Sequence, residues 1–265
     1  MVDILRVLIQ FVFRVTFGLS LAMGIVSPRQ VTSGYYQKHL WVLMGLNTLA
    51  SLAVFSSREA MAQDGTPPGW VLGGAIGLAV GCYVASVVWL YERPGAGRGL
   101  LGLIALGGWV AAFVATPGAR TAARGSGLLT WLDTATGGLV LGTFLAAMFL
   151  GHWYLNHPGM PLAPLQRLIQ LLLGAIVARA LVAGLGVGLR ISVAEVPLAT
   201  EFWLFLSLRW LAGLVGTLAM AGMAWGTLKI PNTQSATGVL YAGVILAFIG
   251  ELTSQLLSVG QSYPV

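Results

Sequence analysis

Long apolar stretches alternate with short polar connectors along this chain. A helix needs about 20 mostly apolar residues to cross the hydrocarbon core of a bilayer. Eight stretches reach about that length, and they lie roughly at residues 4–26, 39–56, 70–91, 99–116, 134–155, 165–189, 200–227 and 236–258. The pattern therefore predicts an all-α fold, a polytopic transmembrane helix bundle with about eight spans.

The connectors between these stretches are only about 7 to 17 residues long. They leave no room for a separate soluble domain, so we expect residues 1–265 to form a single integral membrane domain. An even number of spans puts both termini on one side of the membrane, which we call face A. The connectors near residues 27–38, 92–98, 156–164 and 228–235 then lie on the opposite side, which we call face B.

Composition and charge agree with lipid as the main solvent. Apolar residues make up 57% of the chain and charged residues only 8%, whereas a soluble domain carries about 25% charged residues. Most of the basic residues behind the net charge of +6 stand singly in or near connectors, a pattern typical of contacts with anionic headgroups. We expect the lipid bilayer and other membrane or redox subunits as partners, no nucleic acid, and a location in the inner, or cytoplasmic, membrane of a prokaryote.

All three histidines fall on face B. His39 opens the second span, and His152 and His157 lie at and just after the end of the fifth. Axial ligation of haem b requires two imidazoles on different helices at similar depth, so one hypothesis makes His39 and His152 the metal ligands of a haem. The alternative is hydrogen bonding at the headgroup level, within the belt of Trp and Tyr side chains that such bundles carry.

Ionisable residues also occur deep inside the apolar spans. Counted at about 1.5 Å of helical rise per residue, these residues lie in one layer roughly 10–16 Å from face A; they are Arg14, Arg179, Arg209 and Glu251. A charge near the bilayer centre costs at least about 2.5 kcal/mol, so we expect these groups to satisfy one another. Arg209 and Glu251 lie at matched depth on consecutive spans, which predicts an ion pair between them.

That pairing leaves Arg14 and Arg179 without a carboxylate. Polar side chains at similar depth offer one means of solvating them, namely Gln10, Asn47, Gln170 and Gln255. The functional alternative is a bound ligand with an anionic or carbonyl group, such as a quinone head, a haem propionate or a small organic anion. Arginine suits that role because it stays charged when buried and presents a planar fork of donors.

Three functions remain open at this stage. The first is an integral membrane subunit of a redox or electron-transfer system that holds a haem or a quinone within the bundle. The second is a transporter of a small organic anion, although the sequence displays neither evident repeated halves nor the broken helices typical of many carriers. The third is a non-catalytic assembly or scaffold subunit whose interior charges only fix the packing. No catalytic residue is assigned.

Overall fold

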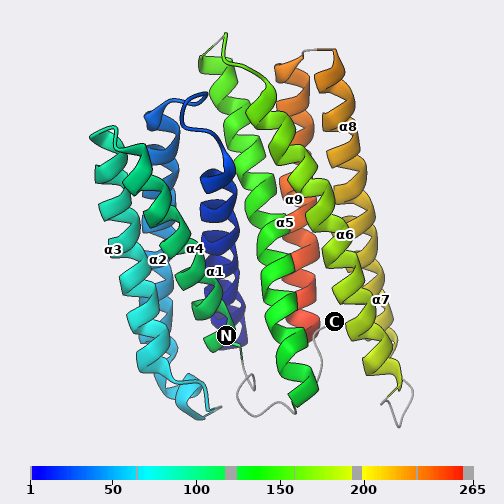
Figure 1. Ribbon diagram of the computed structural model, residues 1–265. Coiled ribbons are helices and arrows are strands. Elements are labelled where there is room, and N and C mark those ends of the chain that lie inside the picture. The colour runs from blue at the N-terminus through cyan, green and yellow to red at the C-terminus, as the bar shows by residue number, and fades with distance from the viewer. Residues whose placement is uncertain are drawn as a thin grey trace.

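The computed structural model describes residues 2–63, 65–116, 124–157, 159–192, 199–230 and 232–258. Within these ranges it is a bundle of helices without strands, and eight helical segments are long and apolar enough to span a membrane (Figure 1). The predicted fold class is therefore confirmed. The first four spans are α1 (Val2–Ile25), α2 (Ser33–Gln63), α3 (Pro68–Leu90) and α4 (Pro94–Val114). The last four are α5 (Arg124–Asn156), α6 (Ala163–Ser192), a segmented seventh span and α9 (Thr233–Ser258).

The seventh span changes its helical type in mid-membrane. It runs as α7 (Thr200–Leu208), then as the π-helix η1 (Arg209–Gly216), and then as α8 (Thr217–Lys229). A π-helical turn inside an α-helix is rare and is found most often at functional sites. Among the residues that the structure describes, the segment that begins with Arg209 is the π-helical one.

Several helices extend beyond the apolar stretches that predicted them. The helix α5 begins at Arg124 rather than near residue 134 and is 33 residues long. Both α3 and α4 begin with a proline in the first turn, where a missing N–H costs nothing because that donor has no partner within the helix. The earlier start of α5 brings Asp133 into a membrane span.

The eight spans form two groups of four with the same order of neighbours. In the first group α1 and α3 each pack against both α2 and α4. In the second group α5 and the seventh span each pack against both α6 and α9. The main contact between the groups joins α1 to α5, the first helix of each (Figure 1). This arrangement reveals the two halves that the residue pattern alone did not display.

Glycines allow α1 and α5 to approach closely where the two halves meet. A Cβ atom on Gly18 would lie 1.7 Å from the carbonyl oxygen of Gly138, and one on Gly142 would lie 1.9 Å from the carbonyl carbon of Gly18. Small residues of this kind let helix backbones touch in lipid, where no hydrophobic force drives helices together. Arg14, one turn before Gly18, is thereby held against the second half.

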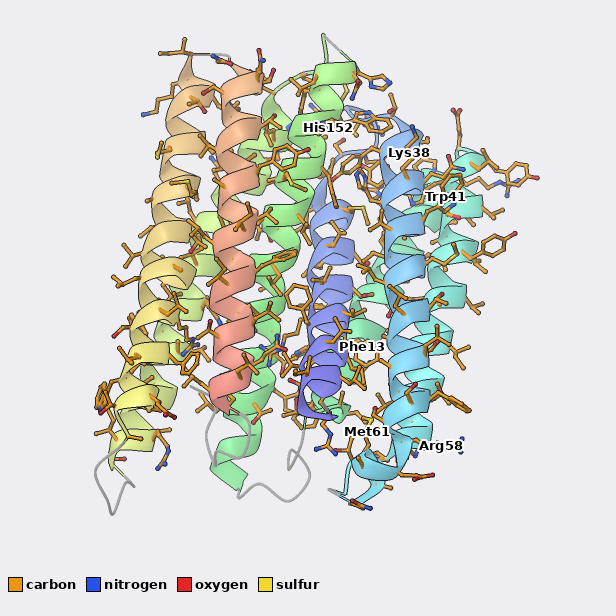
Figure 2. The ribbon with its side chains drawn as sticks, turned by 180° about the vertical axis from the view of Figure 1, so that it is seen from behind. Phe13, Lys38, Trp41, Arg58, Met61 and His152 are labelled. Carbon is orange, nitrogen blue, oxygen red and sulfur yellow. The ribbon has the colours of Figure 1, made fainter. Side chains whose placement is uncertain are left out.

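The beginning of α1 and the end of α9 lie at the same end of the bundle, as an even number of spans requires (Figure 1). Figure 2, seen from behind, shows Arg58 and Met61 toward this same end, which is face A, and His152 and Lys38 toward the other, which is face B.

Candidate functional site

Four buried charged side chains, one from the first half and three from the second, form a closed ring toward face A. Arg14 of α1 donates hydrogen bonds to Glu251 of α9 and, over 2.8 Å, to Asp133 of α5. Arg179 of α6 donates to the same two carboxylates, over 3.0 Å in the case of Glu251. Each arginine thus bridges both acids and each acid bridges both arginines. The ring is electrically neutral, and its members are only 3–5% exposed.

Neighbouring groups add further hydrogen bonds to the ring. Arg179 also donates to the hydroxyl of Ser254 over 3.0 Å and to the backbone carbonyl of Asp133 over 3.2 Å. Gln255 Nε2 lies 3.5 Å from the Glu251 carboxylate. Charge-assisted hydrogen bonds of this kind are roughly twice as strong as neutral ones, so the ring fixes the relative positions of four helices.

The surrounding helix α5 makes room for the ring with a glycine. A Cβ atom on Gly137 would lie 2.5 Å from Glu251 Oε1 and 2.8 Å from Arg14 Nη1. Any larger residue there would displace the two side chains whose hydrogen bond closes the ring. Gly137 is therefore part of the site, although it contributes no polar side chain.

The structure brings together three of the four interior charges that the sequence singled out. Arg14, Arg179 and Glu251 belong to the ring, and the carboxylate that the sequence analysis did not find is Asp133. Of the four polar residues proposed as solvating groups, Gln255 alone bonds to the ring within the described ranges, whereas Gln10 donates to the carbonyl of Ala115.

Arg209 differs from the predicted arrangement. Glu251 bonds to Arg14 and Arg179, so the expected ion pair between Arg209 and Glu251 does not form. Arg209 is 2% exposed, and neither Nη1 nor Nη2 has a hydrogen-bond partner within the described part of the chain. A buried guanidinium with unsatisfied N–H groups is costly in any protein interior. Its presence here calls for a physical reason.

A small cavity lies beside Arg209, between the π-helix and the ring. Its volume is about 10 Å³, which is at the lower limit for one water molecule. Its charged walls are Arg179, Arg209 and Glu251, and its remaining walls are Val140, Gly213, Leu214, Ala247 and Gly250. The backbones of η1 and α9 touch here, since a Cβ atom on Gly250 would lie 2.1 Å from the Cα of Gly213. The cavity is therefore lined by two arginines, one carboxylate and five apolar residues, and of the two arginines Arg179 already donates to the ring.

The candidate haem ligands lie at the other end of the bundle. His39 is buried, and its Nδ1 lies 2.6 Å from the carbonyl oxygen of Tyr35. Its ring stacks on Phe149 of α5, with 4.3 Å between the ring centroids. His152 follows Phe149 by three residues but is exposed.

Comparison with known proteins adds no name to this site. No protein-family model matches the chain, and no curated protein or solved structure matches it either. The described residues also contain no group of three or more histidine, cysteine or acidic side chains that could hold a metal ion. The residues themselves therefore carry the functional conclusion.

Proposed function

We propose that this protein is a membrane carrier for small anions and that Arg209 is the group that binds them. Arg209 carries the proposal because it is a permanent cation, buried, without a hydrogen-bond partner in the described residues, and faces a cavity. An arginine that served only to fix helix packing would be expected to donate to a carboxylate or a backbone carbonyl. Arg209 instead has donors available for a ligand.

The balance of charge in this layer also supports an anion. The ring is neutral, and Arg209 adds one uncompensated positive charge beside it. Removing a charge from water without a partner is strongly unfavourable. An anion bound at Arg209 supplies the missing negative charge and accepts the free N–H groups at the same time.

The position of the site favours transport over simple retention. Many carriers are built from two structural halves and bind their substrate at the interface between them, near the middle of the membrane, beside an interrupted helix. Here the cavity is lined by residues of the second half alone, but it borders the ring through which Arg14 joins the first half to the second. The seventh span is not broken there, but it changes from α-helix to the π-helix η1 at Arg209, the proposed binding residue.

Flux through proteoliposomes tests this function. The full chain is reconstituted, and uptake of chloride, nitrate, formate, acetate and phosphate is measured against protein-free vesicles. We expect uptake of at least one anion, its loss in Arg209→Gln, and its retention in Arg58→Gln, which changes an exposed arginine in the face-A part of α2. If the folded wild-type protein moves none of these anions, or if Arg209→Gln moves them equally well, the proposed carrier function is wrong. The result would then support a non-catalytic scaffold subunit.

A redox subunit is the second candidate, and His39 is the residue that favours it. A haem-ligating histidine commonly bonds through one ring nitrogen to a backbone carbonyl, which leaves the other for the metal. The Nδ1 contact with Tyr35 fits that pattern, whereas the stack against Phe149 covers one face of the ring. For a quinone, Arg14 and Arg179 are already engaged with carboxylates, so Arg209 is the donor left for its carbonyl.

A visible absorption spectrum of the purified protein tests whether it binds a haem. Bis-histidine ligation predicts a Soret band that shifts on reduction and is lost in both His39→Gln and His152→Gln. His157→Gln serves as the matched control because that residue lies one turn beyond His152 and is also exposed. A purified protein without a Soret band, obtained from cells supplied with haem, removes this candidate.

A further inference from the structure

We infer that the anion at Arg209 is a monovalent ion of a single atom, a halide such as chloride. This inference rests on the proposed anion site and narrows it to one chemical class. It follows from three properties of the cavity: the charge that surrounds it, its size, and the chemistry of its walls.

The surrounding charge favours a monovalent ion. The two carboxylates of the ring are balanced by Arg14 and Arg179, so Arg209 contributes a single excess positive charge. A monovalent anion brings the whole layer to neutrality. A divalent anion such as sulfate would leave an excess negative charge in a medium where an unpaired charge is unfavourable.

The volume of the cavity favours a single atom. About 10 Å³ is the lower limit for one water-sized particle, so a halide, which is larger than water, needs only a small outward shift of the walls. A carboxylate or phosphate group has several heavy atoms and would have to part η1 from α9. That movement is opposed by the backbone contact between Gly213 and Gly250, which lies in the wall of the cavity.

The walls of the cavity provide hydrogen-bond donors for a halide but no groups that would orient a larger anion. A halide accepts hydrogen bonds from any direction, so both unsatisfied nitrogens of Arg209 can donate to one ion. Val140, Leu214 and Ala247 provide no groups that would orient a larger oxyanion. Glu251 also borders the cavity, but its two oxygens accept from Arg14 and Arg179, which offsets its repulsion of an anion. A water molecule would accept from Arg209 but would leave its charge uncompensated.

Thermal unfolding of the purified full-length protein in detergent tests the inference. The protein is first exchanged into sodium gluconate, and chloride or bromide is then titrated in at constant ionic strength. We expect a saturable rise in Tm with either halide and no saturable rise with acetate or phosphate. The rise should be lost in Arg209→Gln and kept in Arg58→Gln. Equal responses to acetate or phosphate, or no response to halides, overturn the inference.

Bromide provides a second measurement that needs no variant. Crystals of the wild-type protein grown in sodium bromide should give an anomalous peak within hydrogen-bond distance of the Arg209 nitrogens, and its absence there at saturating bromide contradicts the inference. The two proposals can fail separately. Halide binding without flux in proteoliposomes would contradict the carrier function but not the halide site. Formate flux without halide binding would contradict the halide site but not the carrier function.

Discussion

Arg14 of the first span and Glu251 of the last are joined by a hydrogen bond although 237 residues separate them in the chain. The bond crosses from one half of the bundle to the other, because α1 belongs to the first group of helices and α9 to the second. The same arginine also bonds to Asp133 of α5. The ring of charges can therefore close only after both halves have folded and docked.

Removal of one acid from the ring should strongly destabilise the protein. Glu251→Gln leaves Arg14 and Arg179 with a single carboxylate between them, and stranding a buried charge typically costs about 3–5 kcal/mol. Unfolding by denaturing detergent, followed by the intensity of tryptophan fluorescence, measures the loss. Glu59→Gln changes an exposed acid of α2 and should shift the free energy of unfolding by no more than about 0.5 kcal/mol. Similar losses of unfolding free energy in the two variants would mean that the ring does not stabilise the protein.

Removal of an arginine together with Glu251 should be less harmful than the loss of Glu251 alone. The double variant Arg14→Met with Glu251→Gln leaves Asp133 paired with Arg179, which is a neutral arrangement. Glu251→Gln by itself leaves one excess positive charge. A double-mutant cycle on the free energy of unfolding should give a favourable coupling of about 0.5–3 kcal/mol. Strictly additive losses would mean that the two residues do not interact.

Gly137 should tolerate no side chain. In Gly137→Ala the new Cβ would lie 2.5 Å from Glu251 Oε1, so the hydrogen bond from Arg14 must lengthen or break. We expect a loss of about 1–3 kcal/mol, as for other overpacked sites, measured by the same unfolding assay. Gly73→Ala is the matched control because a Cβ atom there meets nothing within 4 Å. That variant should be unchanged or slightly more stable, since alanine favours helix.

Hydrophobicity along the chain predicts the fold well because lipid imposes a simple rule. Each span must be long and apolar and must satisfy its own backbone, so eight stretches predict eight helices. The ends of the spans are less certain, because a helix continues past the apolar stretch while its polar residues face the interior. Asp133 shows the consequence. It lies one residue before the predicted start of the fifth span, so the apolar pattern alone places it in a connector and offers no carboxylate partner for Arg14 or Arg179.

The depth of a residue in the membrane can be counted along its helix, but the sequence does not show which neighbouring helix its side chain faces. Arg209 and Glu251 do border one cavity, as their matched depth suggested. Their pairing was wrong because Glu251 points to Arg14 and Arg179. Spans that are apolar all round give no sign of which face meets which neighbour. The π-helix that begins at Arg209 also has no signature in the sequence, so neither the free arginine nor its cavity was predictable.

The arrangement of the spans across the membrane predicts which positions share a side. Gln63 ends α2 and Ser192 ends α6 on face A, whereas Gly95 and Asn156 lie at helix ends on face B. Single cysteines at these positions, in a Cys82→Ala background, should divide into the same two pairs when sealed vesicles are treated with an impermeant thiol reagent. Labelling of Gln63 and Ser192 from opposite sides would contradict eight spans.

Substitution by methionine should lower the stability of the protein at Arg179 but not at Arg209. Arg179→Met leaves Asp133 and Glu251 with only Arg14 between them and should cost about 3–5 kcal/mol, as for other broken buried pairs. Arg209→Met breaks no hydrogen bond made within the described residues and removes an uncompensated charge. In halide-free gluconate buffer, we therefore expect Arg209→Met to be as stable as the wild type or more stable.

Added chloride should then make the wild type more stable than Arg209→Met. The wild type gains stability as its site fills, by about 2.7 kcal/mol at a hundredfold excess over Kd, whereas Arg209→Met has no site to fill. Unfolding midpoints of the wild type, Arg179→Met and Arg209→Met, each measured with and without chloride, make the comparison complete. If Arg209→Met is as damaging as Arg179→Met in gluconate, Arg209 serves packing rather than binding, because its charge would then have a partner within the protein.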